Sequence, residues 1–412
     1  MAEDREPHGY TYPNTSDDPD QIDVLRNRFG LRSHAALARA EYRLTNNRLA
    51  DLVLGEGPRG AFDAAHLKAI HRYLFSQVYE WAGHTRNERP IVDGAPVEPI
   101  GGFYKGGTAF LHGSRIEMGL EEALRPLRDP DSLKGTTPAA FAEIAARVLA
   151  DLNYVHPFRE GNGRTQEAFI AALGRHAGHE VDFAVITRPR MIEASRESVG
   201  NPESPALRHL VADAVDPGRR HALRDAFTHL RALGENPYLH EVRTATIGET
   251  VTGGLFGQGA DAVSLVTRDG IVALPKADIS QAQLVSDDEI TVTVRSGFPA
   301  RPEARSASRA AEADPSDQAR AYWQRAAESG AAIRQTERQA RARHAPGKGR
   351  GLTKGRPIAP GDTEHVEKEE SDGPEETNHF PRSGRSDAAG RHGRDRSGRC
   401  RVAGAGRGNR TR

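Results

Sequence analysis

Residues 155–169, VHPFREGNGRTQEAF, bring many chemically special residues together in one short stretch. From His156 to Arg164, nine positions contain a histidine, a proline, a carboxylate, two glycines that flank an asparagine, and an arginine. The residues on both sides have helical spacing, so this stretch is predicted to be a turn that joins two helices.

The helix before the turn is predicted over residues 138–154. Thr137 and Pro138 suit a helix N-cap and first helical position. An apolar stripe at helical spacing follows, and it predicts a central, buried helix that leads into His156: Phe141, Ile144, Ala145, Val148, Leu149 and Leu152. The helix after the turn is predicted from the spacing of Phe169, Ile170 and Leu173.

The start of the second helix is a predicted anion site. Its first backbone N–H groups lack partners within the helix and carry partial positive charge. Gly161 and Gly163 would let a phosphate approach the backbone closely, and Arg164 would add a charged fork to the phosphate oxygens.

Glu160 and His156 supply two further functions beside this anion site. A carboxylate next to phosphates suits Mg²⁺, which prefers one or two carboxylates together with substrate oxygens. A histidine of near-neutral pKa can take a proton from an attacking hydroxyl. Together these residues predict transfer of a nucleotidyl or phosphoryl group from a Mg²⁺-nucleotide to a hydroxyl.

The stretch HPFREGNGR resembles the signature of the Fic family, His-Pro-Phe-x-Asp/Glu-Gly-Asn-Gly/Lys-Arg-x-x-Arg, at every fixed position from His156 to Arg164. Other stretches of roughly residues 8–300 resemble Fic proteins of the toxin and type IV-secreted effector group. They are YTYPNTS, DVLRNRFG, WAG at 81–83 with TR at 85–86, KGG at 105–107 and VDFAVITRPRMI at 181–192.

The resemblance implies protein adenylylation, in which AMP passes from ATP to a Tyr, Ser or Thr hydroxyl of another protein and pyrophosphate is released. By position, His156 would be the general base and Glu160 the Mg²⁺ ligand. The phosphates would be bound by Gly161, Asn162, Gly163 and Arg164. A flap around Lys105 and Gly106 would lie near the nucleotide and register the target chain by edge-strand pairing.

The chain departs from the signature at residue 167, where Glu167 replaces the second arginine. In the family that arginine helps to hold the γ-phosphate, and a carboxylate there would repel a triphosphate. Two alternatives therefore stay open. One is another Fic-type transferase that moves UMP, phosphocholine or phosphate, and the other is a catalytically silenced Fic binding module.

Many Fic proteins are inhibited by a helix with the pattern Ser/Thr-x-x-x-Glu-Gly/Asn. The three candidates, Glu56-Gly57, Glu160-Gly161 and Glu235-Asn236, do not fit it. The resemblance then implies a separate small antitoxin as a partner. DNA gyrase and topoisomerase IV, targets in the toxin branch of the family, are candidate protein substrates by analogy only.

The rest of the chain predicts a mainly α fold with five segments. Residues 1–20 form a flexible arm and 21–235 a helical Fic domain, with helices capped by Ser33 and Asp63 and a hairpin flap within 86–113. Residues 236–300 form a small OB-like β-barrel, with a tight turn at Asp269-Gly270. Residues 301–345 favour a helix, and 346–412 a disordered Arg/Gly-rich tail.

Composition limits the remaining classes of function. Residues 1–300 contain 33 Lys and Arg against 41 Asp and Glu, and residues 301–412 contain 24 against 16, which indicates an acidic body with a basic tail. The single cysteine, Cys400, excludes an intramolecular disulfide. The sequence has neither a secretory h-region nor a long apolar run, so a cytoplasmic protein is expected, with export through a type IV-like route left open. Residues 242–295 interleave few aromatic and basic residues, which argues against a nucleic-acid partner.

Overall fold

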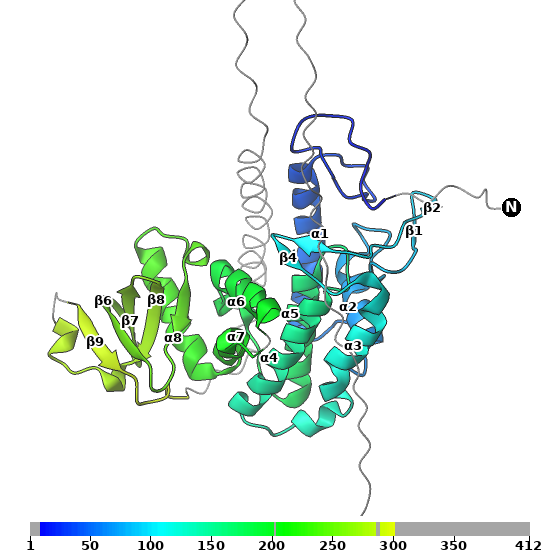
Figure 1. The fold of residues 1–412 in the computed structure, drawn as a ribbon. Helices are drawn as coiled ribbons and strands as arrows, with labels where there is room; N and C mark the ends of the chain where they lie inside the picture. The colour runs from blue at the N-terminus through cyan, green and yellow to red at the C-terminus, as the bar shows by residue number, and fades with distance from the viewer. Residues whose placement is uncertain (1–8, 202, 286–288, 301–412) are drawn as a thin grey trace, which may run out of the picture. The chain divides into compact units, whose positions relative to one another are not determined.

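The computed structural model describes residues 9–201, 203–285 and 289–300 (Figure 1). The described part contains a helical body followed by a β-sheet. The helices are α1 His34–Leu54, α2 Ala64–Phe75, α3 Ile116–Leu124, α4 Pro138–Val155, α5 Asn162–Ala177, α6 Arg188–Gly200, α7 Pro205–Val215 and α8 Pro217–Ala232. Short 3-10 helices lie at Gly113–Arg115, Arg125–Leu127, Pro130–Leu133, Phe183–Val185, Pro237–Leu239, Lys276–Asp278 and Gln283–Val285.

The helix starts follow the capping residues that the sequence predicts. The side chain of Ser33 accepts a hydrogen bond from Ala36 N, that of Asp63 from His66 N, and that of Thr137 from Ala140 N. The apolar stripe of α4 lies in the core, where Phe141, Ala145, Val148, Leu149 and Leu152 are buried and Ile144 is half-buried. Helix α4 packs against α3, α5, α6 and α7, so the predicted central helix is confirmed.

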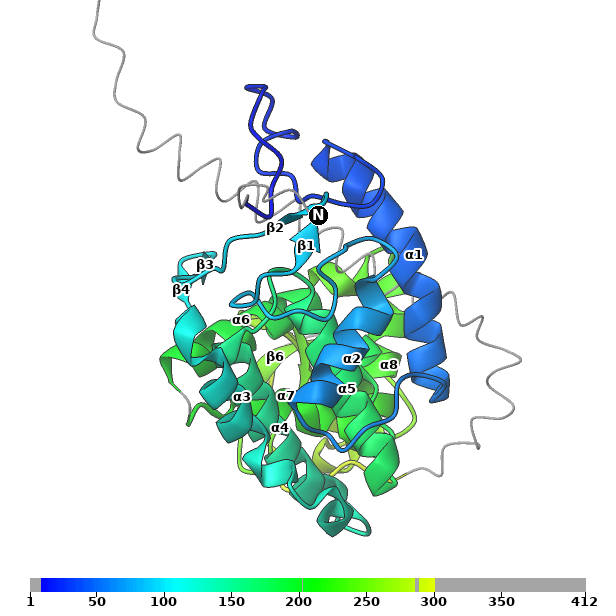
Figure 2. The same cartoon turned by 90° about the vertical axis from the view of Figure 1, so that its right-hand side faces the viewer.

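The predicted flap is two short hairpins. Strands β1 Ile91–Val92 and β2 Ala95–Pro96 pair around the Asp93-Gly94 turn, and β3 Tyr104–Lys105 and β4 Thr108–Ala109 pair around Gly106 and Gly107. Both glycines have positive φ, +57° and +82°, which explains their place in this turn. The two hairpins lie at the same end of the helical body (Figure 2).

Five strands form the second region. They are β5 Val242–Thr244, β6 Thr250–Gln258, β7 Ala262–Thr267, β8 Gly270–Pro275 and β9 Ile290–Thr293, in the sheet order β5-β8-β7-β6-β9. The predicted hairpin at Asp269-Gly270 is confirmed by the pairing of β7 with β8. Strands β5 and β9 are the edges of this sheet, and closure into an OB-like barrel stays a prediction.

Buried charges connect α6, α7 and α8 to the first strand of the sheet. Asp213 on α7 is fully buried and contacts Arg190 Nη1 at 2.7 Å and Arg219 Nη1 at 3.0 Å, and it accepts a hydrogen bond from Thr244 N. Burial alone raises the pKa of Asp213, but Arg190, His209 and Arg219 hold it well below its usual range. Asp213 is therefore a charged anchor between the helices and β5.

The N-terminal segment is tied to the helical body from its first described residues. Tyr10 and Tyr12 are buried, and Tyr12 N donates to Val24 O while Arg26 N donates to Tyr10 O. The predicted segment 301–412, both the helix and the tail, lies outside the described residues. Within the described ranges, no helix is long and apolar enough to cross a membrane.

Candidate active site

The signature turn lies between α4 and α5 and depends on two residues with positive φ. His156 caps α4 with φ +45° and ψ +60°, and Gly161 caps α5 with φ +82°. A Cβ atom on Gly161 would lie 2.5 Å from the Phe75 ring, so only glycine fits this position. The turn is thus bent sharply enough to bring the end of α4 and the start of α5 together.

The imidazole of His156 is oriented by the last turn of α4. Its Nδ1 lies 3.3 Å from Asn153 O, and because a carbonyl oxygen only accepts, Nδ1 carries the proton and Nε2 keeps its lone pair. The ring is half-buried and stacks on Phe110 with a centroid separation of 3.9 Å. Burial, together with the nearby Lys105 charge, lowers the pKa of His156 to about 3, below the near-neutral value that the sequence suggests.

Glu160 and Lys105 meet across the turn and the β3–β4 hairpin. Lys105 Nζ lies 3.1 Å from Glu160 Oε2, and Gly161 N donates to Glu160 Oε1 at 3.0 Å. Burial alone raises the pKa of the Glu160 carboxyl, but the Lys105 and Arg164 charges hold it well below its usual range. The carboxylate is therefore ionised, and the flap lysine predicted from sequence reaches it.

Asn162 braces the turn with its side chain. Its Oδ1 accepts from Phe158 N at 2.9 Å, and its Nδ2 donates to Phe158 O at 2.8 Å. The side chain is buried, so the part of Asn162 that can face a phosphate is its backbone N–H at the start of α5. The sequence does not indicate this division between side chain and backbone.

The start of α5 has the form of an anion site. The first N–H bond within the helix runs from Thr165 N to Gly161 O, so the amides of the preceding residues point from the positive end of the helix. Gly163 is exposed and would have no atom within 4 Å of an added Cβ. This open backbone is the approach that a phosphate needs.

Arg164 faces a carboxylate that the sequence analysis did not select. Its Nη1 lies 2.6 Å from Glu41 Oε1 on α1, and its guanidinium lies over the Phe75 ring at 4.5 Å. The hydroxyl of Tyr79 donates to Glu41 Oε2. Glu41 belongs to the buried face of α1 with Leu37, Thr45, Leu49 and Leu52. A carboxylate on a buried helix face requires a polar partner. The place of Glu41 on this face was therefore the one feature of the sequence that could have indicated its pairing.

Two other residues near the turn were also not selected for a role. His71 on α2 donates from Nε2 to Glu160 O at 3.0 Å, accepts from Gly83 N at 2.8 Å and stacks on Phe158. Arg86 is fully buried and donates to the carbonyl oxygen of His156. Glu167 lies on α5 one turn after Arg164 and is half-buried.

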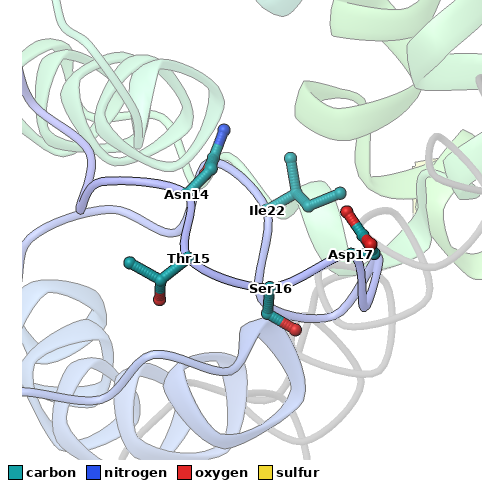
Figure 3. A pocket seen from close by; sticks show the side chains of 5 residues that line it. All are labelled: Asn14, Thr15, Ser16, Asp17 and Ile22. Atoms are coloured by element: carbon teal, nitrogen blue, oxygen red, sulfur yellow. The ribbon is translucent and has the colours of Figure 1, made fainter.

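An open hollow elsewhere on the surface contains none of the predicted site residues. Its lining comes from the N-terminal segment: Asn14, Thr15, Ser16, Asp17 and Ile22 (Figure 3). The chemistry predicted from the sequence therefore concentrates at the α4–α5 turn and the β3–β4 hairpin.

Known proteins of one family are similar to this chain. Residues 61–173 match the Fic/DOC family. A protein adenylyltransferase of Bartonella henselae is 32% identical over 261 residues, which are 63% of this chain and 46% of the relative. The probable protein adenylyltransferase Fic of Salmonella typhimurium is 32% identical over 219 residues, which are 53% of this chain and 96% of the relative.

Among solved structures, the type IV secretion system effector protein BepA is similar with a TM-score of 0.62 and 30% identity, over 71% of this chain and 98% of that chain. A turn with this signature, on a helical body with this flap, defines a Fic fold. The chain belongs to the Fic/DOC family. It spans 46% and 35% of the length of two Bartonella adenylyltransferases that it matches.

Proposed function

We propose that this chain transfers AMP from ATP to the hydroxyl of a protein side chain. The observation that carries the proposal is the pairing of a base and an anion site at one turn. The lone pair of His156 Nε2 is available, and the positive start of α5 follows six residues later. The adenylyltransferase names of the relatives support the same reaction.

The proposed reaction is a displacement at the α-phosphorus of ATP. The hydroxyl oxygen of the target attacks the α-phosphorus, and its proton passes to His156 Nε2. The bond from the α-phosphorus to the bridging oxygen breaks, and pyrophosphate leaves with that electron pair. The amides at the start of α5 and the Arg164 guanidinium would offset the negative charge that develops on the phosphates.

The residues present fit Mg²⁺ bound together with phosphates. In the described ranges, no three His, Cys, Asp or Glu side chains gather to form a metal site, so the protein would offer the single ionised carboxylate of Glu160. One carboxylate plus phosphate oxygens is a common donor set for this ion. Bound there, it would supply charge neutralisation of the phosphates. Lys105, which contacts Glu160 here, would then turn to the phosphate oxygens.

We further propose that the β3–β4 hairpin receives the target chain by edge-strand pairing. The hairpin lies over the site, because Lys105 reaches Glu160 and Phe110 stacks on His156. Tyr104 on β3 is 73% exposed and would meet the incoming segment. We also propose, by analogy, that the target is DNA gyrase or topoisomerase IV. A separate antitoxin as partner and export through a type IV route are further proposals.

Glu167 favours one alternative, a Fic scaffold whose transfer activity is silenced. This carboxylate stands one helical turn from Arg164, where it would repel a triphosphate. Another donor, such as UTP or a phosphocholine carrier, is the remaining alternative. Glu167→Arg separates these two alternatives, since a silenced site would gain activity and a site adapted to Glu167 would lose it.

The test is labelling of lysate protein with α-³²P-ATP and MgCl₂ by the full chain. The wild type is compared with His156→Ala, with Glu167→Arg, and with His221→Ala, a control histidine on α8. Label that requires His156 but not His221 supports AMP transfer. Label from γ-³²P-ATP instead would indicate phosphoryl transfer, and absence of label from either donor in all variants would refute the proposal.

A further inference from the structure

Arg86 is a fully buried cation whose side-chain hydrogen bonds all end on backbone carbonyl oxygens. Burial lowers its pKa to about 10, so it is still charged at neutral pH. Burying a guanidinium is costly unless every donor is satisfied. The acceptors therefore indicate what Arg86 holds together.

The acceptors lie at the end of α4 and in the two segments that flank the β3–β4 hairpin. Arg86 Nε donates to His156 O at 3.0 Å and Nη2 to Val155 O at 3.4 Å. Nη1 donates to Ile100 O and Gly101 O at 3.1 and 3.0 Å, before the hairpin. Nη2 also donates to Leu111 O, after the hairpin. One side chain thus fixes both ends of the hairpin to the turn that carries His156.

The backbone of Arg86 reinforces this connection. Its N–H donates to Pro157 O at 2.7 Å, and its carbonyl oxygen accepts from Ile100 N at 2.7 Å. The hairpin places Phe110 against the His156 ring at 3.9 Å and Phe103 at 5.7 Å, and the Arg86 guanidinium lies 5.1 Å from the centroid of Phe103. The position of the imidazole therefore depends on contacts that Arg86 holds in place.

We propose that Arg86 is a positioning residue for transfer: it sets the His156 imidazole and the β3–β4 hairpin in one fixed arrangement. The proposal rests on the proposed function. Arg86 contacts neither the start of α5 nor Arg164 in any of these bonds, so its effect falls on the base and the flap rather than on the phosphate site.

Arg86→Lys is the conservative test. It keeps the charge, but its three donors sit on one nitrogen and cannot reach carbonyls on both the turn and the hairpin. Arg220 supplies a matched control. It is also buried, and from α8 it donates to the carbonyl oxygens of two α7 residues, Ala214 O at 3.2 Å and Val215 O at 3.0 Å. It also donates to Glu180 O and lies 3.4 Å from the Glu180 carboxylate.

The experiment compares Arg86→Lys with Arg220→Lys in the full chain. The transfer rate at saturating ATP and the Kd of the non-transferable analogue AMPCPP with Mg²⁺ are measured well below both unfolding temperatures. A displaced base costs roughly 100-fold in rate, so Arg86→Lys should lose about that factor. Its AMPCPP Kd should stay within about threefold, and Arg220→Lys should keep the wild-type rate within about twofold.

Two results would overturn the proposal: a transfer rate for Arg86→Lys close to wild type, or a parallel loss of rate and AMPCPP affinity in both variants. If the wild type transfers nothing, the proposed function fails. The ¹⁵N NMR spectrum of the His156 ring then tests whether Arg86 positions the imidazole. A tautomer change in Arg86→Lys that is absent from Arg220→Lys supports positioning, and an unchanged spectrum refutes it.

Discussion

Replacement of Glu41 by glutamine tests what the Arg164 contact does. Arg164 Nη1 lies 2.6 Å from Glu41 Oε1, and the two side chains are 11% and 12% exposed. In the wild type the Tyr79 hydroxyl donates to Glu41 Oε2. Glutamine keeps the shape of the side chain and an oxygen that can accept this bond. The change therefore removes one negative charge and little else.

The expected magnitudes follow from the burial of the pair. Opposite charges about 4 Å apart attract by about 4 kcal/mol at an effective dielectric constant of about 20, and desolvation offsets part of this. We expect Glu41→Gln to lower the free energy of unfolding without nucleotide by about 2 kcal/mol. Nη1 would no longer be shared with Glu41, so nucleotide affinity should rise about tenfold, or about 1.4 kcal/mol.

The assay is titration calorimetry with AMPCPP and Mg²⁺, together with urea unfolding with and without the analogue. Asp51→Asn is the matched control, because Asp51 is also on α1 and accepts from a tyrosine of α2, Tyr73, at 2.6 Å. That control should change stability without raising AMPCPP affinity. Unchanged or weaker affinity in Glu41→Gln would refute competition and indicate that Glu41 orients Arg164 for the phosphate.

Three further outcomes follow from buried groups. Burial lowers the pKa of His71 from its usual 6.5 to about 3. Below pH 6.5 the unfolded chain therefore binds a proton at His71 that the folded chain does not bind, so the free energy of unfolding falls as the pH falls from 6.5. Between pH 8 and pH 5.5, the free energy of unfolding measured in urea should fall by about 1.4 kcal/mol more in the wild type than in His71→Gln. An equal fall in both proteins would contradict this. Asp213→Asn leaves Arg190 and Arg219 without their carboxylate and should lower the free energy of unfolding by about 3–5 kcal/mol; a loss under about 1 kcal/mol would count against the anchor. Gly161→Ala should cost more than about 2 kcal/mol in the same measurement, from its positive φ and the Phe75 ring, whereas Gly163→Ala should stay within about 0.5 kcal/mol of wild type.

Local patterns predicted much of the helical body. Ser33, Asp63 and Thr137 each cap the helix that follows, because capping bonds involve residues three positions apart. The signature turn and the Asp269-Gly270 hairpin are equally local. Such features can be inferred from one sequence, since every participant is a near neighbour in the chain.

The features of the site that the sequence did not predict are contacts between residues far apart in the chain. Arg86 and His156 are 70 positions apart, and His71 and Glu160 are 89 apart. Glu41 lies on α1 and Arg164 on α5, and neither periodicity nor spacing pairs them. The side-chain direction of Asn162 was not available either, because an amide suits a phosphate and a backbone brace equally well.

The left-handed backbone of His156 bears on which residue should replace the proposed base. At φ +45° most L-residues pay a steric cost of roughly 1–2 kcal/mol, whereas asparagine visits this region readily. Alanine at residue 156 removes the imidazole and also strains the end of α4. His156→Asn removes the imidazole and suits the backbone, so it is the better variant for testing the proposed base and for crystallisation with AMPCPP.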